Sequence, residues 1–269
     1  MLTKANIHRL IQLSTKSKAR REAGLFIVDG AKMFVEAPME LLKEVYVTEA
    51  FMHRVDAATS VHLKAIERVD ELKSQKDVII EYVTDEQMKK ISDTQTPQGI
   101  LCVCATPKHS LKTMLDKVNG DGSALFAVLE DIQDPGNLGT IFRTGEGAGV
   151  TGIIMSKGTV DIFNPKTIRS TMGSVYRIPF VYEEDLASVI RQLKKANVSV
   201  YAAHLKGTKN YNEIKYADTA FLIGNEGNGL KDETAALADE YIKIPMSGQV
   251  ESLNVAVATA LLMYEHKHP

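Results

Sequence analysis

The chain has 269 residues, of which 44% are hydrophobic and 25% are charged, as is typical of a globular protein with one or two domains. Its formal net charge of −2 argues against a protein that binds nucleic acid by bulk electrostatic attraction. No apolar run is long enough to cross a bilayer, and the N-terminus lacks a secretory hydrophobic region, so we expect a soluble, cytoplasmic protein without membrane contact.

Positive charge is concentrated at the N-terminus. No acidic residue precedes Glu22, whereas the basic residues before it are Lys4, Arg9, Lys16, Lys18, Arg20 and Arg21. A basic segment of this kind can cover RNA phosphates, and it can equally be a solvated arm without a ligand. The residues alone leave both interpretations open.

The first hundred residues alternate short strands and helices. Their β-branched content and flanking turns predict strands at residues 25–30, 41–48, 76–83 and 99–105. Capping signals and apolar spacing predict helices at 31–38 and 84–93. This alternation predicts a small α/β domain over residues 1–105. The polar segment 106–122, which ends in Asn-Gly-Asp-Gly, is expected to be a linker.

The second half has a more regular pattern. Strands are predicted at 123–130, 151–156, 177–183, 198–204, 219–225 and 241–245. Helices are predicted between most of them, including 185–196 and 231–241. Strands that alternate with helices of this length predict a mostly parallel sheet with both faces covered, here over residues 123–269. Ligands of such sheets bind beyond the carboxyl ends of the strands.

Neither cysteine nor histidine suggests a metal site. Cys102 and Cys104 lie two residues apart on a predicted strand, so their side chains share one face. Residues so close in sequence rarely form a disulfide, and we interpret them as buried apolar residues. Among the seven histidines, only His204 ends a predicted strand, and we interpret it as an ordinary loop residue. We therefore expect no bound metal.

The stretch "DPGNLGTIFRTGEGAG" (134–149) forms a glycine-rich turn between a strand and a helix. It lacks the Gly-Lys-Ser/Thr of a P-loop, and its first two glycines are three residues apart rather than the two of a dinucleotide fingerprint. It does not match either phosphate-binding motif. From the residues alone, Asn137 could be the N-cap of the helix, and Arg143 could form an exposed ion pair with Glu146.

Two further loops follow predicted strands. The segment "LIGNEGNGL" (222–230) has glycines that allow a tight turn or a close approach to a ligand. In "IPMSGQVESLNVAVATALLMYE" (244–265), Ser252 is a plausible N-cap and Asn254 would lie in the first turn of a helix rich in small residues. The three loops hold no Ser-His-Asp set and no carboxylate pair. They suit the positioning of an organic cofactor and an anionic substrate.

Taken together, these three segments resemble the three signature motifs of the SpoU/TrmH family of RNA ribose 2′-O-methyltransferases, of the SPOUT class. The resemblance covers residues 123–269, and it implies S-adenosylmethionine as cofactor and a trefoil knot. The knot follows from the resemblance only, because threaded chains are nearly absent from proteins. The stretch "SKARREAGLFIVDGAKMFVEA" is similar to the family's small RNA-binding domain, which resembles ribosomal protein L30e.

The resemblance implies three groups of site residues. The group at the catalytic centre consists of Asn137, Arg143, Glu226, Ser252 and Asn254. The group that contacts the cofactor, mainly through the backbone, consists of Gly224, Ile244, Met246 and Leu253. The group that contacts substrate RNA consists of Arg169, Arg20 and Arg21.

The implied chemistry needs neither a metal nor a covalent intermediate. A ribose hydroxyl attacks the methyl group of a sulfonium, so alignment and exclusion of water supply much of the rate enhancement. Arg143 could act as the base if its environment permits, or it could orient the ribose and stabilise the alkoxide. Both roles stay open at this point.

We expect a homodimer that modifies RNA, with 23S ribosomal RNA favoured over transfer RNA as the substrate. The alternatives are a transfer RNA 2′-O-methyltransferase and a non-catalytic RNA-binding or ribosome assembly factor. A nicotinamide-dependent enzyme is disfavoured, because the dinucleotide fingerprint fails and no acidic residue ends a suitable second strand.

Overall fold

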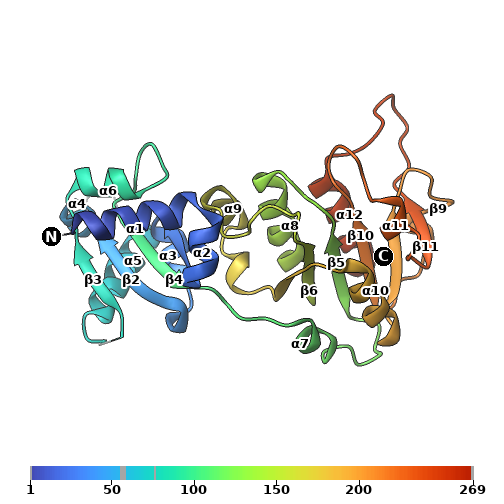
Figure 1. Cartoon of the computed structure of the whole chain (residues 1–269), viewed down its shortest axis with the longest axis horizontal. Helices are drawn as coiled ribbons and strands as arrows, with labels where there is room; N and C mark the ends of the chain where they lie inside the picture. Colours follow the sequence, from blue (N-terminus) through green and yellow to red (C-terminus); the bar gives the residue numbers. More distant parts are fainter. Residues whose placement is uncertain (1, 55–58, 76, 268–269) are drawn as a thin grey trace. The chain divides into compact units, whose positions relative to one another are not determined.

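The computed structural model describes residues 2–54, 59–75 and 77–267. By its internal contacts the chain divides into two compact units (Figure 1). Unit 1 comprises Met1–Pro107 and Asp161–Tyr176, and unit 2 comprises Lys108–Val160 and Arg177–Pro269. The segment Asp161–Tyr176 therefore groups with unit 1, although it lies within the sequence range 123–269.

Unit 1 is built on a four-stranded sheet of order β1-β4-β2-β3. Its strands are β1 (Leu25–Asp29), β2 (Leu42–Val47), β3 (Ile79–Tyr82) and β4 (Ile100–Ala105). Strands β1 and β2 are antiparallel to β4, and β3 is parallel to β2. Its helices are α1 (Lys4–Thr15), α2 (Ser17–Ala23), α3 (Ala31–Glu36), η1 (Met39–Leu41), α4 (Glu49–His53), α5 (Ser60–Leu72), α6 (Asp85–Ile91), α9 (Pro165–Thr171) and η2 (Ser174–Tyr176).

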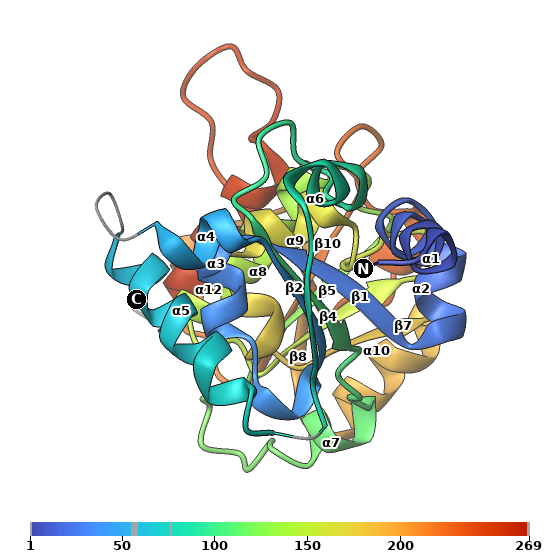
Figure 2. The ribbon, with the colours of Figure 1, turned by 90° about the vertical axis from the view of Figure 1, so that its left-hand side faces the viewer.

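Helices cover both faces of the unit 1 sheet. Figure 2 shows α1 and α6 on one side and α3 and α5 on the other. Leu101 and Val103 of β4 belong to the core that also contains Leu10 of α1. Because side chains alternate along a strand, Cys102 and Cys104 are buried on the opposite face. The hydrogen bond with the neighbouring Cys104 thiol and burial raise the pKa of the Cys102 thiol, and both cysteines pack in the interior of unit 1.

The basic N-terminus is helical rather than an extended arm. Thr3 caps α1 by accepting a hydrogen bond from the Asn6 amide at 3.2 Å. Leu10 and Leu13, three residues apart, are buried and share one face of the helix. The apolar residues between the basic positions therefore anchor this segment to the sheet. The sequence patterns do not predict α1, α2 or α5 as helices.

Unit 2 contains a seven-stranded sheet of order β7-β6-β5-β10-β8-β11-β9. All of its paired strands are parallel. The strands are β5 (Leu125–Leu129), β6 (Gly152–Ser156), β7 (Phe180–Glu183), β8 (Ser199–Ala203), β9 (Lys209–Asn210), β10 (Thr219–Ile223) and β11 (Glu240–Lys243). The helices are α7 (Leu111–Leu115), α8 (Pro135–Gly147), α10 (Leu186–Lys195), η3 (Tyr211–Glu213), α11 (Asp232–Ala235) and α12 (Val255–Lys267).

Both faces of the unit 2 sheet are covered. Apolar residues of α7 and α10 share one core with alternate residues of β5, β8 and β10. Helix α12 contacts α8, β5 and β10, and α8 turns Gly145 towards Ile153 of β6. These observations confirm the predicted α/β fold with a mostly parallel sheet. The trefoil knot that the resemblance implies stays a prediction.

Two predicted elements of unit 2 have different limits in the structure. Helix α11 covers only Asp232–Ala235 instead of 231–241, because Asp239 already bonds to β8 through its backbone N–H and its carboxylate. The expected linker contains α7, whose Leu111 and Met114 are buried in the unit 2 core. None of the helices in the three described ranges is long and apolar enough to cross a bilayer.

The sheet order brings the key loops to one edge. Strands β5, β10, β8 and β11 are neighbours and run parallel. Their carboxyl ends therefore lie along the same edge, where the loops that follow them meet. These loops include the glycine-rich turn before α8 and the segments 224–230 and 244–254.

Candidate active site

A cavity of about 430 Å³ lies at the carboxyl ends of β8, β10 and β11 and beside the start of α12. Its volume falls in the range that binds small organic ligands. All four predicted cofactor residues line it, namely Gly224, Ile244, Met246 and Leu253. Glu226 and Ser252 of the predicted catalytic group also line this cavity, whereas Asn137, Arg143 and Asn254 do not.

Gly224 lets the loop after β10 fold back on itself. A Cβ atom at this position would lie 2.0 Å from the Leu230 amide nitrogen and 2.1 Å from the Gly229 carbonyl carbon. Asn225 and Gly229 form a two-way backbone bridge, with N···O distances of 3.0 and 2.9 Å. The Asn225 side-chain oxygen also accepts hydrogen bonds from the amides of Gly227 and Asn228. The loop that borders the cavity is therefore held closed by its own backbone.

The Glu226 carboxylate joins the loop after β10 to the start of α8. It accepts hydrogen bonds from the backbone amides of Gln133 and Asp134 and from the Asn137 side-chain amide, each at 3.0 Å. Partial burial alone would raise the pKa of Glu226, but the hydrogen bonds from Asn137, Asp134 and Gln133 outweigh it, and the pKa lies below its ordinary value. The side chain therefore stays ionised and fixes Asn137.

Asn137 and Asn254 complete this network. The Asn254 side-chain nitrogen donates to the Asn137 side-chain oxygen at 2.9 Å, while the Asn137 nitrogen donates to Glu226. The Asn254 oxygen accepts from the amides of Ala256 and Val257 at 2.9 and 3.3 Å. Residues 137, 226 and 254, far apart in sequence, thus form one chain of hydrogen bonds.

The structure corrects both predicted helix caps. Asp134, not Asn137, is the N-cap of α8, and Pro135 follows it in the first turn. The Asp134 side chain accepts a hydrogen bond from the Asn137 backbone amide at 2.8 Å. Because Asp134 caps the helix, the Asn137 side chain is available for the network. At α12, Asn254 rather than Ser252 caps the helix, which begins at Val255.

Arg143 is exposed on α8. The predicted ion pair with Glu146 does not form, because Glu146 binds Arg177, with one N···O distance of 3.0 Å. Within the described ranges, no hydrogen bond or ion pair involves the Arg143 guanidinium. Its five N–H donors are therefore available to an external anion.

The three arginines of the predicted RNA group differ in their surroundings. Arg20 is only 3% exposed, and it donates to the carbonyls of Leu13 and Ser14 and to the Asp161 carboxylate at 2.8, 3.0 and 2.9 Å. This burial contradicts its expected contact with RNA, because its donors are already used within the protein. Its neighbour Arg21 is exposed at the end of α2.

Arg169 lies on α9 and pairs with Asp93 at 3.1 Å. Both residues belong to unit 1. One guanidinium nitrogen of Arg169 is buried without a hydrogen-bond partner, so the side chain retains unused donor capacity beside its ion pair. Its proposed contact with substrate phosphate stays a prediction.

Sequence reasoning missed the residues that hold the loop before α8. The Gln133 side chain donates to the carbonyls of Asp131 and Gly158 at 3.0 and 2.7 Å. Lys231 pairs with Asp131 at 2.8 Å. The Lys231 ammonium and the Ser156 hydroxyl lower the pKa of Asp131. The sequence signal for these residues is weak, because it is limited to polar side chains directly after a buried strand.

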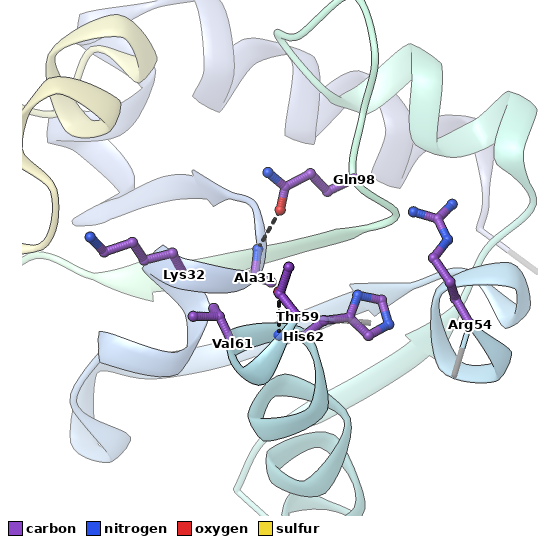
Figure 3. Close-up of a pocket in the computed structure, with 7 residues that line it drawn as sticks. All are labelled: Ala31, Lys32, Arg54, Thr59, Val61, His62 and Gln98. Carbon is purple, nitrogen blue, oxygen red and sulfur yellow. Dashed lines mark hydrogen bonds between the residues drawn. The ribbon is translucent and has the colours of Figure 1, made fainter. Parts of the chain in front are cut away.

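Unit 1 has a cavity of about 360 Å³, which sequence reasoning also missed. Figure 3 shows Lys32 and Arg54 on opposite sides of it, with Gln98 and His62 between them. The Gln98 oxygen accepts from the Ala31 amide at 3.0 Å, which leaves the amide nitrogen of Gln98 as a donor. No group of three or more His, Cys, Asp or Glu side chains in the described parts of the chain could hold a metal ion.

Comparison with known proteins identifies the family. The SpoU rRNA Methylase family matches residues 124–264, and the MRM3-like substrate binding domain matches residues 4–102. The chain is 32% identical over 256 residues to 23S rRNA (guanosine(2553)-2′-O)-methyltransferase RlmP of Bacillus subtilis, covering 94% of this chain and 92% of that protein.

Solved structures agree with this match. A crystal structure of an rRNA methyltransferase from Sinorhizobium meliloti superposes with a TM-score of 0.82 and 29% identity, covering 99% of this chain and 95% of that one. The AdoMet-bound structure of the Sinorhizobium meliloti enzyme gives the same TM-score at 28% identity, covering 99% of this chain and 96% of that one. The chain therefore belongs to the SpoU rRNA methylase family, as the three motifs predict.

Proposed function

We propose that this protein transfers the methyl group of S-adenosylmethionine to a ribose 2′-hydroxyl of 23S ribosomal RNA. The observation that carries the proposal is the hydrogen-bonded chain from Asn254 through Asn137 to Glu226, built beside the cavity that the four predicted cofactor residues line. Family membership makes the protein an RNA methyltransferase. Similarity to 23S rRNA 2′-O-methyltransferases of Bacillus subtilis and Xylella fastidiosa supports 23S rRNA as the substrate, and with it a cytoplasmic location.

The cavity fits S-adenosylmethionine in size and chemistry. Its walls include Ile223, Ile242 and Leu262, which suit an aromatic base, and its rim includes the exposed backbone of the 224–230 loop, which suits polar groups. Gly224 keeps this backbone close because a side chain there would collide with Leu230. When bound, the cofactor supplies an electrophilic methyl group.

The residues beside the cavity would align the ribose. Asn137 uses both atoms of its amide within the protein, so we assign it, with Glu226 and Asn254, to positioning the start of α8. Arg143 presents free N–H donors from the same helix. We propose that Arg143 binds the ribose or its phosphate and stabilises the developing alkoxide, because a guanidinium has donors and no acceptor.

We propose that residues 1–105 hold the RNA and that residues 123–269 carry out the transfer. The match to a substrate binding domain over residues 4–102 supports this division. Exposed basic residues in the first range, including Arg21, Lys32 and Arg54, provide positive charge for phosphates despite the net negative charge of the chain.

We also propose a homodimer that associates through α12. Val257, Leu261 and Tyr264 are four and three residues apart, so they share one face of the helix, and they are 49%, 37% and 43% exposed. An apolar stripe of this kind is typical of an interface. The test is sedimentation of Leu261→Asp beside the unmodified chain. We expect the variant to be monomeric, and a monomeric unmodified chain at micromolar concentration would contradict the proposal.

The decisive experiment for the function maps 2′-O-methyl groups after incubation with S-adenosylmethionine. The substrates are unmodified 23S rRNA and a pool of unmodified transfer RNA. We expect one new 2′-O-methyl nucleotide in 23S rRNA. Methylation of transfer RNA alone would show that transfer RNA, and not 23S rRNA, is the substrate. Binding of cofactor and RNA without methyl transfer would identify a non-catalytic RNA-binding factor.

A further inference from the structure

The turn His204–Gly207 follows β8 and borders the cavity. The Gly207 amide donates to the His204 carbonyl at 2.9 Å, and the His204 amide donates to the Ile242 carbonyl at 2.9 Å. A Cβ atom on Gly207 would lie 2.6 Å from the Ile242 carbonyl carbon. The turn is therefore seated directly on β11, and His204 is held at a fixed position.

The local hydrogen bonds also fix the tautomer of His204. Its Nδ1 accepts a hydrogen bond from the Lys206 amide at 3.1 Å, so in the neutral ring the proton resides on Nε2. The ring lies against Tyr241, with centroids 5.2 Å apart. Among the described residues, none accepts a hydrogen bond from Nε2. His204 thus presents an oriented N–H donor at the wall of the cavity.

The sheet order indicates which part of the cofactor this donor meets. Asn137 follows β5, whereas His204 follows β8, two strands further along the sheet. With about 4.8 Å between neighbouring strands, the two loops are separated by about 10 Å. Asn137 and Arg143, which we propose to act at the ribose, both lie on the helix that follows β5. The methyl group would then lie on the β5 side, and His204 would face the far end of the bound molecule.

The far end of the cavity suits a flat aromatic ring. The cavity lining includes Ile242 of β11, the strand next to β8, and Ile244, which directly follows β11; Leu253, in the segment before α12, lines the same cavity. Adenine is the aromatic part of S-adenosylmethionine, and its ring nitrogens accept hydrogen bonds. We propose that His204 donates its Nε2–H to an adenine ring nitrogen of the cofactor and thereby selects the adenosyl group. This inference rests on the proposed function.

The test measures binding of S-adenosylhomocysteine to the full chain by calorimetry. His204→Phe keeps an aromatic ring against Tyr241 and removes the donor. We expect its dissociation constant to rise about fivefold to tenfold, as for the loss of one neutral hydrogen bond. The matched control is His8→Phe, the same change at an exposed position of α1, which should bind as the unmodified chain does. Equal affinity of His204→Phe and the unmodified chain would overturn the proposal.

Deaza analogues locate the contact. S-adenosylhomocysteine with carbon in place of N1, N3 or N7 is titrated into both proteins. We expect one of the three analogues to bind the unmodified chain about fivefold to tenfold more weakly than S-adenosylhomocysteine does. The same analogue should bind His204→Phe as tightly as S-adenosylhomocysteine binds that variant. A His204→Phe penalty that persists with all three analogues would overturn the assignment to adenine. If the unmodified chain binds no S-adenosylhomocysteine at all, the proposed cofactor fails together with this inference.

Discussion

Replacing Glu226 by glutamine tests the link between the hydrogen-bond network and catalysis. The carboxylate accepts from two backbone amides and from Asn137, and glutamine keeps its shape but only one accepting oxygen. If the oxygen stays towards Asn137 and Asp134, the new amide group faces the Gln133 N–H, so two donors oppose each other. Charge-assisted bonds contribute about 1.5–3 kcal/mol each when buried. Because the Glu226 side chain is exposed at the rim of the cavity, we expect Glu226→Gln to lower the free energy of unfolding by about 1 kcal/mol in total.

The effect on stability should depend on pH. The folded-state pKa of Glu226 lies below the unfolded value of 4.5, so the ionised side chain stabilises the fold above that pH, and this contribution is lost as the pH falls through the folded pKa. Chemical denaturation of Glu226→Gln and the unmodified chain should therefore differ at pH 7. The difference should shrink below about pH 4.5.

The effect on catalysis should be larger than the effect on stability. A loosened Asn137 misplaces the start of α8, and a misplacement of about 1 Å can reduce the rate about 100-fold. We expect a loss of this size in kcat with an almost unchanged dissociation constant for S-adenosylhomocysteine. A stability difference that is the same at pH 7 and pH 4, or a fully active variant, would refute the reasoning.

Three other substitutions have defined outcomes. Arg143→Ala should abolish methyl transfer while calorimetry shows cofactor affinity within about threefold, and a parallel loss of both would contradict its assignment to the substrate. Gly224→Ala should destabilise the fold by about 1–3 kcal/mol and weaken cofactor binding at least tenfold, because its Cβ atom would lie 2.0 Å from a backbone nitrogen; Gly227→Ala, with 3.5 Å to its nearest neighbour, is the control. Arg20→Ala should cost about 3 kcal/mol in denaturation because it leaves a partly buried carboxylate unpaired, whereas exposed Arg21→Ala should cost under about 0.5 kcal/mol.

The sequence predicts the sheet of unit 2 well, because its signals are local. Buried strands such as Leu125–Leu129 and Thr219–Ile223 are short apolar runs bounded by turns. The gathering of Gly224, Ile244 and Leu253 at one cavity also follows, because parallel strands end at a shared edge. The fold class is therefore accessible from the residues, and the residues that the family resemblance assigns to the cofactor line one cavity, although cofactor binding there stays a prediction.

What the sequence does not predict depends on contacts between distant residues. Arg20 looks like a solvent-facing cation until Asp161, 141 residues away, is placed beside it. The choice between Ser252 and Asn254 as the cap of α12 cannot be made from side-chain preference, since both residue types cap helices well. Helix α1 forms because its apolar positions, among them Leu10 and Leu13, meet the sheet of unit 1, and a count of charges does not reveal this.

Asn254 takes part in two separate features of the molecule, the start of α12 and the hydrogen-bond network beside the cavity. It starts the helix that carries the exposed apolar stripe, and it holds the side chain of Asn137. A shift of the first turn of α12 would therefore be transmitted directly to the reaction centre. In the homodimer that we propose, assembly and turnover would share this one amide, so dilution that separates the subunits is expected to lower the specific activity of each chain.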